Sequence, residues 1–312
     1  MSMNITEKIE LFNKMPKYKQ KSNEWLEQRH NYLTASTIAQ ALGLMGKKAR
    51  KNLLINKSSY GKYCGFNGNI ATHHGCKFET IANNLYSYKN GNAEIYEFGM
   101  ITNMKYPILG VSPDGILADR MLEIKCPYSR TIDGTIKTEY LHQMQEQMYV
   151  CEFDKCDFLE CKFNVICDDI YFYETFDTFN NFQGIIIVYL DTIENEVSFM
   201  YSPIEYYNNL IKINEWVNTK IKQMEQIEQI EQSNNIYLGV TCWRLDCYLC
   251  RTINRDPNWI IQNYPILEKF WKEVEYYRIN GYEQLLEIDS KNTQNSDEES
   301  SIKSMMNSVC FI

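Results

Sequence analysis

One stretch of the chain decides the fold: residues 111–127 read V-S-P-D-G-I-L-A-D-R-M-L-E-I-K-C-P. Asp114 stands in a Pro-Asp-Gly turn, which ends one extended run and opens the next. We expect residues 121–126 to form the second strand of a short hairpin. That strand stops at Pro127, because proline cannot donate a hydrogen bond to the sheet.

The predicted hairpin brings two carboxylates and one ammonium to a single point. Successive strand residues point to opposite faces, so Glu123 and Lys125 share one face while Leu122 and Ile124 enter a core. With Asp114 they offer the oxygen ligands that Mg²⁺ prefers and a lysine that can orient a metal-activated water. The spacing D-x(8)-E-x-K also arises by chance, and a solvated turn with an exposed Glu–Lys strand is the alternative.

Basic residues are concentrated near the N-terminus. The net charge of the 312 residues is −8, yet residues 1–63 carry 12 Lys or Arg against 4 Asp or Glu. This segment could contact phosphates, although a solvated lysine-rich segment explains the charge equally well. No apolar run reaches membrane-spanning length and no signal-peptide pattern is present, so we expect a soluble, intracellular protein without a membrane partner.

A second candidate site lies in residues 23–43, which read N-E-W-L-E-Q-R-H-N-Y-L-T-A-S-T-I-A-Q-A-L-G. We expect Asn23 to cap one helix and Thr34 or Ser36 to cap the next. A hydroxyl beside free helix N–H groups suits a phosphate, and Arg29 could add a bidentate contact. From these residues alone, a plain cap at Ser36 and a surface cation at Arg29 are the favoured interpretation.

Two further predicted helices carry polar candidates. In the segment H-H-G-C-K-F-E-T-I-A, Glu79 lies off the centre of an apolar stripe, where a solvated glutamate is the usual alternative. Residues 139–150 place Tyr140, Gln143 and Gln147 on one helix face, opposite a buried face. That uncharged face suits phosphate or bound water, and an ordinary polar helix surface is the alternative.

Four motifs within residues 23–165 together resemble the PD-(D/E)xK nuclease superfamily, and within it the phage lambda exonuclease and YqaJ-type viral recombinase family. They are W-x-x-x-R-x-x-x-L-T-A-S, G-x-x-x-E-x-x-A, S-P-D-G followed by L-E-I-K-C-P, and Y-x-x-Q-x-Q-x-x-M. Their joint occurrence in family order is far more specific than any one motif.

The resemblance implies an α/β (α+β), restriction-endonuclease-like fold, with a mixed central sheet flanked by helices and a helical C-terminal extension. It also implies a metal-dependent exonuclease that degrades duplex DNA from 5′ to 3′, in viral or phage-like recombination, replication or repair. The implied roles are metal binding by Asp114, Glu123, Glu79 and the Ile124 carbonyl, water positioning by Lys125, phosphate or water contacts by Gln143, 5′-phosphate binding by Arg29 and Ser36, and minor contacts by Tyr140 and Gln145.

For the organisation of the chain we expect an exonuclease core over residues 1–200, an extension packed on it over 201–288, and a disordered tail over 289–312. Residues 157–164 and 185–190 alternate as strands. Residues 203–222 read as an amphipathic helix that runs into a three-residue repeat.

Three cysteines near the end of the chain are an ambiguous motif. Cys242, Cys247 and Cys250 are spaced C-x4-C-x2-C, and C-x-x-C is a frequent metal knuckle. No fourth ligand lies close in the sequence, and eleven cysteines without a secretory signal indicate reduced thiols or a metal rather than disulfides. We therefore expect thiols in an ordinary strand in preference to zinc or an iron–sulfur cluster.

The implied cofactor is Mg²⁺ or Mn²⁺, as two ions, and the implied partners are duplex DNA ends, a single-strand annealing protein and two further copies in a trimer. A viral protein of this kind would act in the host cytoplasm, in a viral factory, or in the nucleus. Two other classes stay open. One is a different PD-(D/E)xK enzyme, an endonuclease or an iron–sulfur nuclease, and the other is a non-catalytic DNA-end binder that keeps the fold.

Overall fold

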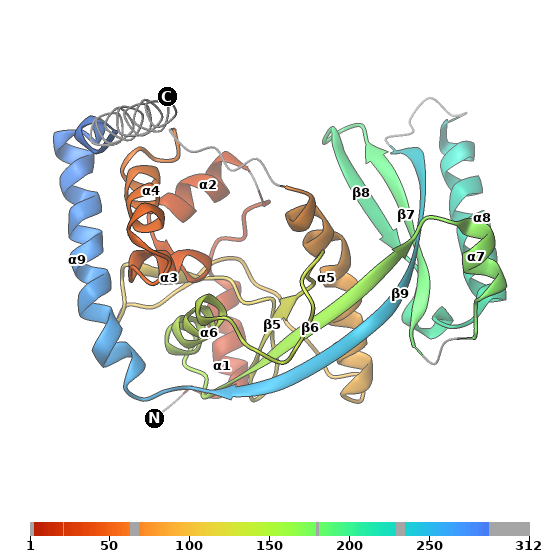
Figure 1. The fold of residues 1–312 in the computed structure, drawn as a ribbon, viewed down its shortest axis with the longest axis horizontal. Coiled ribbons are helices and arrows are strands. Elements are labelled where there is room, and N and C mark those ends of the chain that lie inside the picture. The colour runs from red at the N-terminus through yellow and green to blue at the C-terminus, as the bar shows by residue number, and fades with distance from the viewer. Residues whose placement is uncertain (1–2, 21, 63–68, 179–180, 229–234, 287–312) are drawn as a thin grey trace, which may run out of the picture.

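Two β-sheets with helices packed on both faces make up the described part of the chain, residues 3–20, 22–62, 69–178, 181–228 and 235–286 of a computed structural model (Figure 1). The smaller sheet has the order β1-β3-β2 and the larger β4-β5-β6-β9-β7-β8. The strands are β1 Leu33–Thr34, β2 Ile101–Thr102, β3 Leu109–Val111, β4 Gly115–Ile116, β5 Met121–Lys125, β6 Lys155–Ile166, β7 Gln183–Asp191, β8 Glu196–Tyr201 and β9 Asn235–Asn254.

The helices lie at both ends of the larger sheet and on both its faces (Figure 1). The α-helices are α1 Ile5–Asn13, α2 Asn23–His30, α3 Ile38–Ala41, α4 Lys47–Ser58, α5 Ile70–Lys89, α6 Thr138–Val150, α7 Asp169–Glu174, α8 Leu210–Glu228 and α9 Trp259–Asn280, and the 3₁₀ helices are η1 Ala35–Thr37 and η2 Ile204–Tyr206. This mixed α/β architecture, with helices flanking a mixed sheet, confirms the predicted fold class.

The strand β9 joins the two ends of the molecule. Its first half pairs with β7 and its second half pairs antiparallel with β6, from Cys242 opposite Ile166 to Asn254 opposite Lys155. Twenty residues of strand span roughly 65 Å. β9 lies beyond residue 200, so one sheet contains strands from both sides of the expected boundary between core and extension.

The alternation predicted for β5 is confirmed and places two different cores on the two faces of the sheet. Leu122 and Ile124 pack with α5, whose Phe78, Ile81 and Leu85 are fully buried. The opposite face packs against α6, α4, α9 and the smaller sheet, with Met121, Phe158, Met144 and Met148 in its core. Glu123 and Lys125 therefore lie on the α6 face, at the edge of an apolar core.

Several predicted element boundaries need correction. Ser22, rather than Asn23, caps α2, and its hydroxyl accepts a hydrogen bond from the Trp25 amide. Ser36 lies inside the 3₁₀ turn η1, and the N-cap of α3 is Thr37, which makes no side-chain cap bond. The repeat's last residues and the expected tail at 289–312 lie outside the described residues.

Candidate functional site

Asp114 stands in the turn between β3 and β4, where the sequence predicts it. Its Oδ2 accepts a hydrogen bond of 2.6 Å from the Ile124 amide, so the turn is tied to the middle of β5. The following glycine is required because a Cβ at Gly115 would lie 2.5 Å from a methyl carbon of Ile95. The aspartate is therefore fixed beside the strand that carries Glu123.

Glu123 is fully buried and is held from three directions. Its Oε1 accepts hydrogen bonds from the Lys125 ammonium and, at 2.5 Å, from Gln143 Nε2. Its Oε2 accepts a bond of 2.8 Å from Gln147 Nε2. A buried carboxylate needs such donors, because burial without them carries a large free-energy penalty. The helix α6 thus fixes the orientation of the β5 carboxylate.

A third carboxylate approaches from α5. The Glu79 residue is exposed at the surface, but surrounding protein desolvates its carboxylate and raises its pKa; Lys125 lowers this pKa, and Glu123 and Glu97 raise it. Burial likewise raises the pKa of Asp114 well above its ordinary value, with added repulsion from Glu123 and Glu79. The structure therefore brings the three predicted acids into one electrostatic neighbourhood.

Lys125 is the cation of this neighbourhood. Burial by itself lowers the pKa of Lys125, but the carboxylates of Glu123 and Asp114 outweigh it and raise the pKa above its ordinary value. Lys125 Nζ also lies 5.3 Å from the centre of the Tyr140 ring, a cation–π distance. The lysine is therefore charged at neutral pH and held between a carboxylate and an aromatic face.

The donor set fits a divalent cation. Three carboxylates face a single ammonium, and oxygen-rich, negatively charged sites are those that Mg²⁺ or Mn²⁺ take. Asp114, Glu123, Glu79 and the Ile124 carbonyl are the groups that could hold the ion. Within the described ranges no three His, Cys, Asp or Glu side chains already form a cation cluster, and the Glu123 oxygens instead accept the bonds given above.

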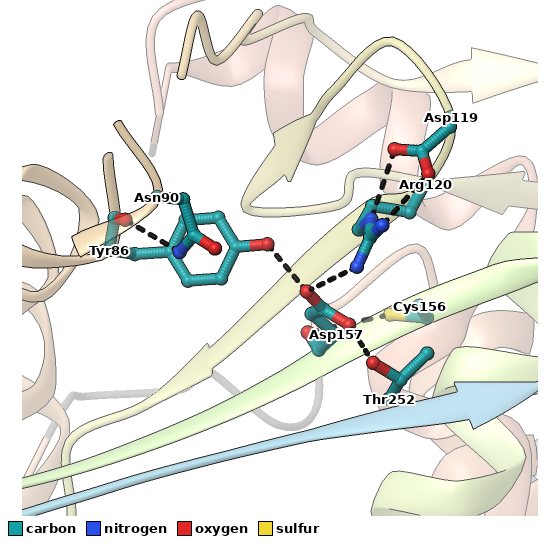
Figure 2. Close-up of polar contacts among 7 residues, drawn as sticks. All are labelled: Tyr86, Asn90, Asp119, Arg120, Cys156, Asp157 and Thr252. Atoms are coloured by element: carbon teal, nitrogen blue, oxygen red, sulfur yellow. Dashed lines mark hydrogen bonds and ion pairs between the residues drawn. The ribbon is translucent and has the colours of Figure 1, made fainter. Parts of the chain in front are cut away.

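A buried network on the α5 face of the sheet fixes the turn between β4 and β5 (Figure 2). The Asp157 carboxylate accepts hydrogen bonds from Tyr86 on α5 at 2.5 Å, Thr252 on β9 at 2.5 Å and Arg120 in the turn at 3.3 Å. Arg120 also pairs with Asp119 beside it. Asp157 therefore connects the hairpin that bears the acids to a helix and to a distant strand.

Arg29 and Ser36 lie together at a second place. Arg29 Nη2 is 3.2 Å from Ser36 Oγ and 3.5 Å from Thr34 Oγ1, and its guanidinium stacks on the Trp25 ring at 4.6 Å. Burial lowers the pKa of Arg29. A guanidinium and a hydroxyl that converge in this way can take a phosphate.

The helix α6 connects the carboxylate site around Glu123 with the Arg29–Ser36 site. α6 carries Gln143 and Gln147, which bind Glu123, and it packs against η1, which carries Ser36. Gln147 was placed by helical periodicity on the polar face of α6, but only the structure shows that it binds the carboxylate. Gln145 has a different role: its amide bonds the backbone of Asn254 and Asp256 and so holds the β9–α9 connection.

The three cysteines of the C-x4-C-x2-C motif all lie in β9. A strand rises about 3.3 Å per residue, so Cys242 and Cys250 are roughly 26 Å apart and cannot share an ion. Cys242 packs in a cluster with Phe172 and Ile213, and Cys250 packs against the core beneath α5. An extended strand is thus incompatible with the turn that a C-x-x-C knuckle requires.

Comparisons with known proteins agree with this architecture. Residues 24–154 match the YqaJ-like viral recombinase domain. The chain is 30% identical to the uncharacterized protein R354 of Acanthamoeba polyphaga mimivirus over 87% of this chain, and it spans 55% of that relative's length. No described helix is both long and apolar enough to cross a membrane.

Solved structures show the same fold. The alkaline exonuclease LHK-Exo from Laribacter hongkongensis superposes with a TM-score of 0.50 at 20% identity, covering 88% of this chain and 99% of that one. The structure of LHK-Exo in complex with dAMP gives a TM-score of 0.51 at 20% identity, covering 86% of this chain and 100% of that one. The chain is therefore similar to the YqaJ-like viral recombinase domain over residues 24–154 and shares the fold of the alkaline exonuclease structures.

Proposed function

We propose that this chain is a metal-dependent DNA exonuclease that degrades duplex DNA from its 5′ ends. The observation that carries the proposal is the meeting of Asp114, Glu123 and Glu79 with one lysine, Lys125, on a fold of the alkaline exonuclease type. Three acids around one ammonium, with Glu123 fully buried among them, are unfavourable for stability alone, because desolvation and mutual repulsion raise the pKa values of Asp114 and Glu79. Such an arrangement is typical of a site that takes a cation and a phosphate.

The chain's own groups would divide the work as follows. A bound Mg²⁺ or Mn²⁺, or a pair of them, would activate water and neutralise charge on the phosphate. Lys125, protonated at neutral pH, would orient the attacking water and share the transition-state charge. Gln143 and Gln147 hold the Glu123 carboxylate in one orientation, and the Ile124 amide holds Asp114. Preorganised groups of this kind need not reorganise during the reaction.

The 5′ direction is proposed from Arg29 and Ser36. A terminal phosphate carries more negative charge than an internal diester, so it gains more from a guanidinium and a hydroxyl that converge on one point. α6 contacts both the η1 turn that carries Ser36 and the carboxylate of Glu123. A DNA 5′ end bound at Arg29 would therefore place the next phosphodiester bond at Asp114, Glu123 and Glu79.

The test of nuclease chemistry is a time course on linear duplex DNA labelled at one 5′ end. We expect release of the label with Mg²⁺, none with EDTA, and a loss of roughly 10²- to 10³-fold in rate for Lys125→Ala. Lys105→Ala is the control, because Lys105 forms an exposed ion pair with Glu152. Full activity in EDTA or in Lys125→Ala would contradict the proposal.

The same assay separates the other classes. Cleavage of covalently closed circles would identify an endonuclease, and tight binding of ends without cleavage would identify a non-catalytic DNA-end binder. The direction is tested on matched duplexes with 5′-phosphate or 5′-hydroxyl ends. Wild type should prefer the phosphate and Arg29→Ala should not, whereas label loss from 3′ ends would refute the direction.

The partners beyond DNA are proposed from the family resemblance alone. A trimer that surrounds DNA would appear in light scattering as three times the 36.9 kDa chain mass. A single-strand annealing protein would be co-purified from cells that replicate the parent genome, and microscopy there would show whether the protein concentrates in the cytoplasm, a viral factory or the nucleus.

A further inference from the structure

Two basic side chains, the buried Lys57 and the partly buried Arg278, hold the end of the helix that carries Arg29. Lys57 on α4 is 3% exposed, and its ammonium donates hydrogen bonds of 2.5 Å to the carbonyls of Arg29 and Tyr32. Arg278 on α9 donates a bond of 2.6 Å to the carbonyl of His30. Two carbonyls in the last turn of α2, and the Tyr32 carbonyl just beyond it, are therefore fixed by side chains from two other helices.

The two cations are also tied to each other. Arg278 donates from Nε and Nη2 to the Lys57 carbonyl at 3.2 and 3.1 Å, so it joins the end of α4 to the end of α2. Its guanidinium is stacked on Tyr60 at 4.2 Å and on Trp271 at 5.2 Å. A guanidinium held by three hydrogen bonds and two rings has little conformational freedom. It therefore restrains the backbone of His30, next to Arg29, and the residue Lys57, whose ammonium binds the Arg29 carbonyl.

This arrangement is more positive than a helix end requires. A glycine C-cap satisfies terminal carbonyls without any charge, and one exposed lysine is a common alternative. Burial first, and then the nearby Lys57, Arg278 and Arg29, lower the pKa of His30 to about 4, so the potential at this point is positive. Burial, with Arg29 and Arg278, likewise lowers the pKa of Lys57 to about 7. An anion bound at Arg29 and Ser36 would relieve that potential.

A buried carboxyl group near Lys57 comes from the helix that holds Glu123. Glu146 on α6 is fully buried, neither of its oxygens has a hydrogen-bond partner among the described residues, and Lys57 is the cation that acts on it. Gln147, the next residue, donates to Glu123. Burial raises the pKa of Glu146 well above its ordinary value and Lys57 lowers it, so Lys57 is coupled electrostatically to the helix that orients the candidate metal ligand.

We propose that Lys57 and Arg278 are positioning residues for recognition of the 5′-terminal phosphate: they hold the last turn of α2 so that the Arg29 guanidinium meets the phosphate. The inference rests on the proposed exonuclease function. It places α9, which lies outside residues 24–154, within the apparatus that recognises the DNA end.

The test compares Arg278→Gln with Arg50→Gln. Arg50 also joins α4 to α9, through a bidentate pair with Glu273 at 3.1 and 2.9 Å and a stack on Phe270, but it is not among the donors to the α2 carbonyls. The measured quantity is the ratio of kcat/KM on duplexes with 5′-phosphate and 5′-hydroxyl ends. We expect Arg278→Gln to lower this ratio at least tenfold, Arg278→Lys to restore part of it, and Arg50→Gln to keep the wild-type ratio.

Other outcomes overturn the inference in distinguishable ways. If wild type prefers phosphate ends and Arg278→Gln keeps that preference, or if Arg50→Gln loses it equally, the positioning role is wrong and the proposed function stands. If Arg278→Gln does not fold, Arg278→Lys and Lys57→Met decide by the same ratio. If wild type shows no cleavage, or no preference for phosphate, the proposed function or its direction fails first and the inference fails with it.

Discussion

The hydrogen bond from Gln147 to Glu123 makes a sharp test of how this site is built. In Gln147→Met a side chain of similar size replaces the amide, so packing on α6 is largely kept while Glu123 Oε2 loses its 2.8 Å donor. Hydrogen bonds to charged groups contribute about 1.5–3 kcal/mol. Donors that orient a metal ligand typically change metal affinity about 10- to 100-fold, which corresponds to a similar free energy.

Gln145→Met is the matched control on the same helix. Its amide makes two hydrogen bonds, of 2.9 and 2.8 Å, to the backbone at Asn254 and Asp256, and neutral bonds contribute about 1 kcal/mol each. Both variants should therefore lose roughly 2 kcal/mol in the free energy of unfolding. Only Gln147→Met should also change the metal requirement.

The assay is an Mg²⁺ titration of nuclease rate, accompanied by urea unfolding of both variants. We expect the half-saturating Mg²⁺ concentration of Gln147→Met to rise about 10- to 100-fold and that of Gln145→Met to stay at the wild-type value. An unchanged concentration in Gln147→Met, or an equal rise in both variants, would refute the reasoning that α6 presents Glu123 to a metal.

Three further outcomes are expected. Asp157→Ala removes the acceptor of three donors and should lower the free energy of unfolding by about 3–5 kcal/mol, against about 1 kcal/mol for Thr252→Val, both measured by urea unfolding. Burial and nearby cations lower the pKa of His30 to about 4, so between pH 6.5 and pH 4 the unfolded chain binds a proton at His30 that the folded protein does not. The stability of the wild type therefore falls as the pH drops through this range. When thermal unfolding is compared at pH 7 and pH 5, His30→Gln should lose less stability than wild type, by roughly 2 kcal/mol. Cys247→Ser should leave the iron and zinc content of anaerobically purified protein unchanged, and stoichiometric metal that disappears in this variant would contradict our reading of β9.

Local periodicity was enough to predict the parts of the site that lie on one element. The two-residue repeat of a strand placed Glu123 and Lys125 on one face, and the helical repeat placed Gln143 and Gln147 on another. The structure adds that these two faces meet. The turn at Asp114 was predicted for the same local reason, since Pro-Asp-Gly has few other conformations.

The parts that the sequence could not predict depend on contacts between distant residues. Nothing near Lys57 indicates that its ammonium binds the carbonyl of Arg29, or that Arg278, 248 residues beyond His30, completes the same arrangement. The 3₁₀ turn at Ser36 was expected as a helix start because a hydroxyl before an apolar run is a common cap. In the structure η1 packs against α6 and β3, and the backbone at Ser36 takes the tighter 3₁₀ turn.

The length of β9 has a consequence for how the chain is made. β6 can complete its antiparallel pairing with β9 only after residue 254 has been synthesised, roughly a hundred residues after the start of β6. Pairings so distant in sequence form slowly, and until they form β6 presents an open edge that can pair with other chains. A ribosome-bound chain that ends before residue 235 would therefore hold β5 and its carboxylate next to an unprotected strand. We expect such fragments to need a chaperone. The 24–154 segment ends before β6 and leaves the β5 edge unpaired, so we expect it to aggregate rather than fold when expressed alone.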